Sequence, residues 1–61
     1  MKMTPQWEKE FRKELLRLVT ELNAHEIDQE VFFWRNYPDD VSPLEAAQDT
    51  AWTYLDVREE E

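Results

Sequence analysis

The stretch Glu30–Asp40, EVFFWRNYPDD, decides how this chain of 61 residues can pack. It places four aromatic rings within six residues and follows them with two adjacent carboxylates. Pro38 pushes Tyr37 toward an extended conformation, so a helix that contains the rings ends before this point. The stretch therefore predicts a short aromatic element that is followed by a polar loop.

As a helix, this aromatic element has two apolar faces. At about 100° per residue, the side chains of residues 31–34 point in four directions. One stripe consists of Ile27, Val31 and Trp34, and another of Phe33 and Tyr37. A strand over the same residues also has two apolar faces, and the β-branched and aromatic content is compatible with a strand. Either the first and third helices cover both faces, or one face stays open for a partner or a second copy.

The residues before this element predict an amphipathic helix over 5–23. Thr4 is a good N-cap, and Pro5 occupies the first helical position, where its missing N–H has no cost. Apolar side chains then recur at helical spacing on one stripe, at Trp7, Phe11, Leu15, Leu18 and Leu22. Asn23 ends this helix in a left-handed conformation or caps the next one through a capping box with Glu26. A single continuous helix through Asn36 is a further alternative.

The residues after the loop predict a third helix, over 43–58. Ser42 and Glu45 form a capping-box pattern around Pro43. The predicted inward stripe consists of Leu44, Ala47, Ala51 and Leu55. We therefore expect one all-α domain, residues 1–61, with three helices at roughly 5–23, 27–36 and 43–58. The first two are separate or continuous.

Composition limits where such a chain can reside. There is no cysteine, and hence no disulfide or thiolate metal site. No run of 18 or more apolar residues is present, and the N-terminal residues lack the apolar segment of a secretory signal. We expect a cytoplasmic protein that does not enter a membrane.

The formal net charge of −8 is unevenly distributed. Residues 1–20 carry five bases and three acids, whereas residues 21–61 carry two bases and twelve acids. Most of the chain would therefore repel nucleic acid and anionic membranes. This asymmetry favours a basic partner, or it serves only solubility.

The sequence contains few residues of the types that catalytic sites use. There is one histidine, one serine and no cysteine, which leaves almost no nucleophile pair, and no glycine for a phosphate-binding loop. His25 with Glu21 and Asp28 could share one helix face, but metal sites in helix bundles need further ligands from other helices. We expect no enzymatic activity, no cofactor and no metal.

The third helix carries the more informative pattern. Glu45, Asp49, Asp56 and Glu60 fall within about 60° of each other on its surface. Carboxylates one turn apart, at about 5.4 Å, have a spacing similar to that of the phosphates in a nucleic-acid strand. We expect Trp52 to lie beside this row and Asp39 and Asp40 to extend it. The row is either a solvated face or the site that binds a partner, with Glu45, Asp49, Trp52, Asp56, Asp39 and Asp40 as the candidate partner-binding residues.

In size and charge, the chain resembles the very small, acidic helical proteins that mobile elements such as phages use against host defences. Among these are anti-CRISPR and anti-restriction proteins that imitate DNA. The resemblance implies a protein that inhibits or regulates a basic nucleic-acid-binding protein without itself binding nucleic acid. The alternative is an assembly subunit that forms a homodimer through residues 31–37. The candidate interface or core residues of that segment are Phe32, Phe33, Trp34 and Tyr37.

Overall fold

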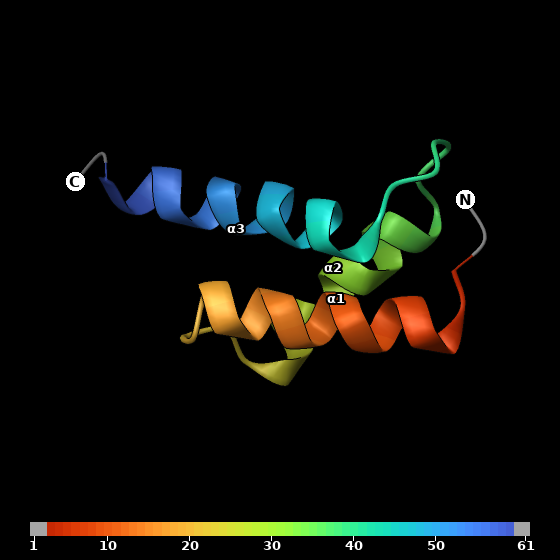
Figure 1. Cartoon of the computed structure of the whole chain (residues 1–61). Coiled ribbons are helices and arrows are strands. Elements are labelled where there is room, and N and C mark those ends of the chain that lie inside the picture. Colours follow the sequence, from red (N-terminus) through yellow and green to blue (C-terminus); the bar gives the residue numbers. More distant parts are fainter. Residues whose placement is uncertain (1–2, 60–61) are drawn as a thin grey trace.

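The computed structural model describes the backbone of residues 3–59 and the side chains of residues 3–55. It is all-α, with α1 at Pro5–Leu18, α2 at Ala24–Arg35 and α3 at Pro43–Glu59. α1 and α3 run side by side in the same direction, and α2 returns behind them in the opposite direction (Figure 1). None of the helices in this part of the chain has the length and apolar character that crossing a membrane requires.

The first helix begins as predicted and ends earlier. The Thr4 hydroxyl oxygen accepts a hydrogen bond from the backbone N–H of Trp7 at 3.1 Å, and Pro5 is the first helical residue. The predicted end at residue 23 is wrong, because Val19 leaves the helical conformation with φ −130° and ψ 87°. Val19 and its neighbour Thr20 are β-branched, and this type of side chain favours extended backbone.

Asn23 starts α2 and does not end α1. Its side chain accepts from the Glu26 N–H at 2.8 Å, and the Glu26 carboxylate accepts from the Asn23 N–H at 3.1 Å. The capping-box alternative is therefore confirmed. The predicted start at residue 27 is wrong, and so is the continuous helix, because Asn23 has extended backbone with ψ 172°.

The aromatic stretch is helical, which makes the strand alternative wrong. Asn36 ends α2: its backbone N–H donates to the carbonyl of Phe32 at 3.3 Å, and its side-chain amide donates to the same oxygen at 2.9 Å. The predicted boundary at residue 36 therefore holds to within one residue.

The core forms around α1, which contacts both other helices. The predicted stripe of α1 supplies Phe11 and Leu15, both fully buried, and α2 contributes Ile27, Val31 and Trp34. α2 is consequently not a middle layer, and the interpretation that helices cover both of its faces is wrong. Phe32 and Phe33 remain 66% and 54% exposed.

Small side chains bring α3 against α1. Among the side chains of α3 that are described, up to residue 55, the buried ones are Ala46, Ala47, Thr50 and Ala51. Leu44 is wrongly placed in the predicted inward stripe, because its side chain is 54% exposed. Interhelical distance depends on the side chains at the contact, and alanines permit a close approach. At the start of α3, the Glu45 N–H donates to the Ser42 hydroxyl at 3.2 Å.

Candidate partner-binding groove

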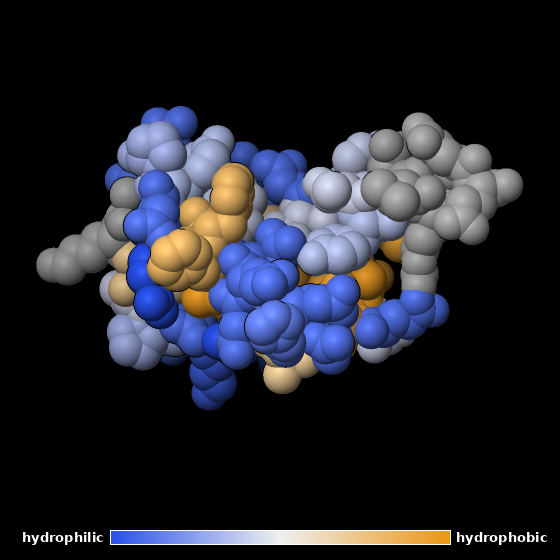
Figure 2. Space-filling model, turned by 180° about the vertical axis from the view of Figure 1, so that it is seen from behind, coloured by the Kyte–Doolittle hydropathy of each residue, from blue (hydrophilic) through white to orange (hydrophobic). Residues whose placement is uncertain are grey.

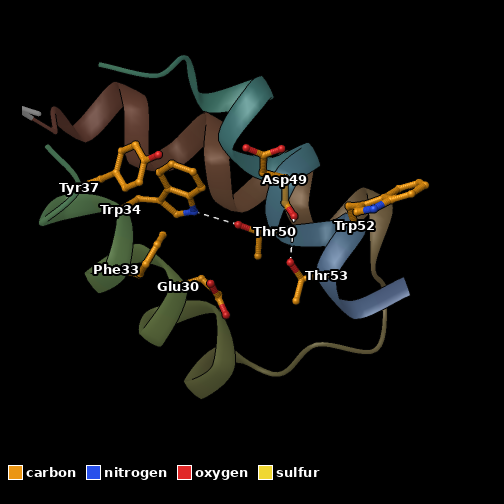
Figure 3. A pocket seen from close by; sticks show the side chains of 8 residues that line it. All are labelled: Glu30, Phe33, Trp34, Tyr37, Asp49, Thr50, Trp52 and Thr53. Atoms are coloured by element: carbon orange, nitrogen blue, oxygen red, sulfur yellow. Dashed lines mark hydrogen bonds between the residues drawn. The ribbon is translucent and has the colours of Figure 1, made fainter. Parts of the chain in front are cut away.

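A groove separates α2 from α3 and holds a cavity of about 450 Å³. Figure 3 shows its lining, with one set of side chains coming from each helix. α2 contributes Glu30, Phe33 and Trp34, the turn after α2 contributes Tyr37, and α3 contributes Asp49, Thr50, Trp52 and Thr53. We call this feature the α2–α3 groove. It unites two sets of residues that the sequence suggested separately, the aromatic segment and the acidic helix.

The α2 side of the groove is a set of rings in mutual contact. The Phe33 and Trp34 rings meet edge to face with centroids 5.3 Å apart, and the centroids of Trp34 and Tyr37 lie 4.8 Å apart. Trp34 is buried, and its indole N–H donates to the Thr50 hydroxyl on α3 at 2.8 Å. This hydrogen bond joins the two helices beneath the groove (Figure 3).

A second hydrogen bond between the helices involves Glu30. The Tyr54 hydroxyl donates to Glu30 Oε2 at 2.9 Å. Burial, followed by the hydrogen bond to Glu30 and its negative charge, raises the pKa of Tyr54 to about 12. Tyr54 holds one oxygen of the Glu30 carboxylate, and among the described residues it is the only hydrogen-bond donor to this side chain.

The α3 side of the groove combines a carboxylate with an exposed indole. Trp52 is 70% exposed and extends away from the rings of Phe33, Trp34 and Tyr37 at one end of the groove (Figure 3). The Thr53 hydroxyl donates to the backbone carbonyl of Asp49 at 3.3 Å. No described residue makes a hydrogen bond or ion pair with the Asp49 carboxylate.

Three other predicted acids are exposed and do not line the groove: Asp39, Asp40 and Glu45. The predicted capping box of α3 is incomplete, since the Glu45 carboxylate accepts no hydrogen bond from the described residues. We call Asp39, Asp40, Glu45 and Asp49 together the acidic face. The side chain of Asp56 and the whole of Glu60 lie outside the described residues. Of the four carboxylates in the predicted row, the structure therefore describes those of Glu45 and Asp49.

The three arginines whose side chains are described form ion pairs away from the acidic face. Arg12 contacts Glu8 at 2.9 Å and Asp28 at 2.6 Å, which links α1 to α2. Arg17 pairs with Glu14, and Arg35 lies 3.7 Å from Glu8. Within the described side chains, every ion pair therefore joins residues of α1 and α2, and none neutralises the acidic face.

A second hollow, of about 480 Å³, lies on the outer side of α2. It is lined by Gln29, Phe32, Phe33, Asn36, Tyr37 and Pro38. Seen from the side of α2, hydrophobic atoms gather there among hydrophilic neighbours (Figure 2). We call this surface the outer aromatic patch. Phe33 and Tyr37 separate it from the α2–α3 groove, since both residues line both hollows.

Sequence reasoning missed Glu30, Thr50 and Thr53 as members of the site. The signal for Glu30 was present, because Glu30, Phe33, Trp34 and Tyr37 follow the i, i+3, i+4, i+7 spacing of one helix face. Thr50 had no comparable signal. It acts as the acceptor for an indole on another helix, and this contact depends on how α2 and α3 pack.

Within the described part of the chain, no three acidic or histidine side chains come together to hold a metal ion. Comparisons of the chain with protein-family models, curated proteins and solved structures find no significant match.

Proposed function

We propose that this chain is a non-enzymatic binding protein that inhibits or regulates a basic nucleic-acid-handling protein. It binds in the cytoplasm to the surface that otherwise holds nucleic acid, as DNA-mimicking anti-CRISPR and anti-restriction proteins do. The chain itself does not bind nucleic acid, because its net charge of −8 repels phosphates.

The observation that carries this proposal is the placement of unpaired charge. The acidic face has no ion pair within the described residues, although α1 carries several bases. Glu45 and Asp49 repel each other one turn apart, at a cost of a few tenths of a kcal/mol, roughly. A cationic surface relieves this repulsion, and nucleic-acid-binding proteins present such surfaces.

The test begins with capture from a cell lysate by the wild type, by Glu45→Lys and by a control, Glu10→Lys. Both substitutions change the charge equally, and Glu10 is an exposed residue of α1 outside the acidic face. Wild type and control are expected to retain a nucleic-acid-binding protein that added salt releases, whereas Glu45→Lys retains much less. The purified partner should then lose bound DNA as the chain is added.

Two results would contradict the proposal. One is a captured protein whose affinity for the chain does not change between low and high ionic strength, because exposed charge pairs are screened by salt. The other is equal loss of capture by Glu45→Lys and Glu10→Lys. Circular dichroism of both variants excludes unfolding as the cause.

A second candidate function is favoured by one specific observation, the exposure of Phe32 and Phe33 at 66% and 54%. Here the chain is an assembly subunit that forms a homodimer through the outer aromatic patch. Sedimentation equilibrium tests it with Phe32→Asp, since Phe32 does not line the α2–α3 groove. A wild-type dimer that this variant separates, with capture of the basic partner unchanged, would favour assembly over partner binding.

A further inference from the structure

We infer that the α2–α3 groove is the pocket in which the partner's arginine side chain is held. The planar guanidinium stacks on an exposed ring that borders the groove and pairs with the Asp49 carboxylate. This inference rests on the proposed function and deepens it, because it assigns one chemical group of the basic partner to one pocket.

The charge of the groove selects a cationic occupant. Of its eight lining residues in the described part of the chain, two carry carboxylates, Glu30 and Asp49, and none is a base. Tyr54 engages only Oε2 of Glu30, and the Asp49 carboxylate has no partner among the described residues. Both carboxylates therefore retain acceptor capacity toward an entering cation.

The floor and the α2 side of the groove are fixed before any ligand arrives. Phe33, Trp34 and Tyr37 are in ring contact, and the Phe33 and Tyr37 centroids are 5.8 Å apart. The hydrogen bonds Trp34–Thr50 and Tyr54–Glu30 connect this side to α3. A preformed pocket lowers the ordering cost of binding, which raises affinity without further contacts.

Arginine fits this lining better than lysine does. A guanidinium stacks on aromatic faces and pairs with a carboxylate through two parallel hydrogen bonds, whereas an ammonium is a compact, strongly hydrated point charge. Phe33 and Trp52 supply the exposed rings, at 54% and 70% exposure. The negative face of such a ring attracts a cation placed over it.

A second copy of the chain does not fit the groove. Each copy carries a net charge of −8, so the two copies repel each other overall, and a basic partner is the better match for the carboxylates of the groove. The cavity of about 450 Å³ is wide enough for the residues next to the arginine to enter as well. The occupant is therefore a segment of a basic protein.

The experiment uses a short blocked peptide with one arginine between glycines, titrated into the full chain and followed by nuclear magnetic resonance. Matched peptides replace the arginine by lysine or by citrulline, which keeps the shape and lacks the charge. Shifts are expected at the Trp52 indole N–H and at the amides of Phe33 and Thr53. The arginine peptide should bind most tightly, and the citrulline peptide should cause no shift.

Variants of the chain test whether the arginine peptide binds in the groove. Asp49→Asn or Trp52→Ala is expected to weaken the arginine peptide by about tenfold, the size of one lost charge-assisted contact. Two controls are expected to have no effect. Glu10→Gln removes an equal charge on α1, and Leu44→Ala truncates an exposed apolar residue of α3 outside the groove.

Three results would each overturn the inference. The first is that shifts spread over all carboxylate-bearing residues, and the second is that the lysine peptide binds as tightly as the arginine peptide. The third is that Glu10→Gln weakens binding as much as Asp49→Asn does. Its failure is distinguishable from failure of the proposed function. If capture of a nucleic-acid-binding protein depends on Glu45 and salt while the peptide does not bind in the groove, the function stands and the pocket assignment falls. If the arginine peptide binds in the groove and no such protein is captured, the assignment stands and the partner is of another kind.

Discussion

At the scale of single residues, two hydrogen bonds set the distance between α2 and α3. The buried indole N–H of Trp34 donates to Thr50 at 2.8 Å, and the Tyr54 hydroxyl donates to Glu30 at 2.9 Å. A buried donor without an acceptor has a larger cost than the bond itself contributes. These residues therefore contribute to the shape of the groove through their hydrogen bonds as well as through the small area that they bury.

Thr50→Val tests the first of these bonds. The substitution keeps the shape of the side chain and removes the acceptor, which leaves the Trp34 N–H buried and unpaired. We expect a loss of about 1–3 kcal/mol in the free energy of unfolding, measured by urea denaturation. Thr50→Ser keeps the hydroxyl and should lose less. If both variants lose the same amount, the hydrogen bond has no such role.

The hydrogen bond between Tyr54 and Glu30 makes the free energy of unfolding depend on pH in the alkaline range. The pKa of Tyr54 is raised from 10.0 to about 12, first by burial and then by Glu30. Because the folded state keeps the proton more tightly, its contribution is fully present below pH 10. It is lost as the pH rises from 10 to about 12. Denaturation midpoints across this window should fall with rising pH.

Ultraviolet titration of the phenol checks the same bond directly. In a Tyr37→Phe background, Tyr54 is the only tyrosine. Glu30→Gln should lower the pKa of Tyr54, although burial, the larger cause, keeps it above 10.0. Glu10→Gln should leave it unchanged. A pKa of 10.0 in the parent would contradict the buried, hydrogen-bonded position of this phenol.

At the scale of elements, the helix ends decide the topology. α1 stops at Leu18, and Val19 and Leu22 remain buried although neither belongs to a helix. The connection to α2 is therefore packed into the core. Asn23 then begins α2 with both bonds of a capping box. The reversal of chain direction depends on this cap, because a continuous helix would carry α2 away from α1.

Asn23→Ala tests the importance of the cap. It removes the acceptor for the Glu26 N–H and is expected to lower the free energy of unfolding by about 0.5–2 kcal/mol. The matched control is Gln29→Ala, an exposed position inside α2, for which a change within about 0.5 kcal/mol is expected. Thermal and urea unfolding followed by circular dichroism give both values. A loss no larger than that of the control would show that α2 does not need its cap.

At the scale of the whole molecule, a small core supports an extended shape. The chain measures 36 × 20 × 17 Å, and α1 makes the most extensive contacts with the other two helices. A domain of this size buries only about 60% of its unfolded surface. Little apolar material remains to cover Phe32, Phe33 and Trp52, which leaves these rings available to partners.

Leu15→Ala tests how small the margin of stability is. Leu15 is fully buried, and its truncation costs about 2–5 kcal/mol. At about 0.05–0.15 kcal/mol per residue, that loss is comparable to the stability of the entire domain. We expect the variant to be largely unfolded at room temperature by circular dichroism. Leu16→Ala, next in sequence and 42% exposed, should remain folded.

Local patterns were sufficient to predict the helices and much of the core. Thr4 and Pro5 predicted the start of α1, the spacing of Phe11 and Leu15 predicted its buried stripe, and Pro38 predicted that α2 ends near residue 36. These features depend on residues close in sequence, and helical periodicity and capping chemistry act over that range. The end of α1 was harder, because Asn23 suits both a helix end and a helix start.

The sequence by itself determined an all-α domain with its negative charge concentrated after residue 20. Only the tertiary structure decided that α1 is the central helix, that Leu44 faces solvent, and that Asp49 and Trp52 share a groove with Phe33 and Tyr37. The physical reason is that periodicity defines which residues share a face of one helix. Which face meets which neighbour depends on packing between side chains far apart in sequence.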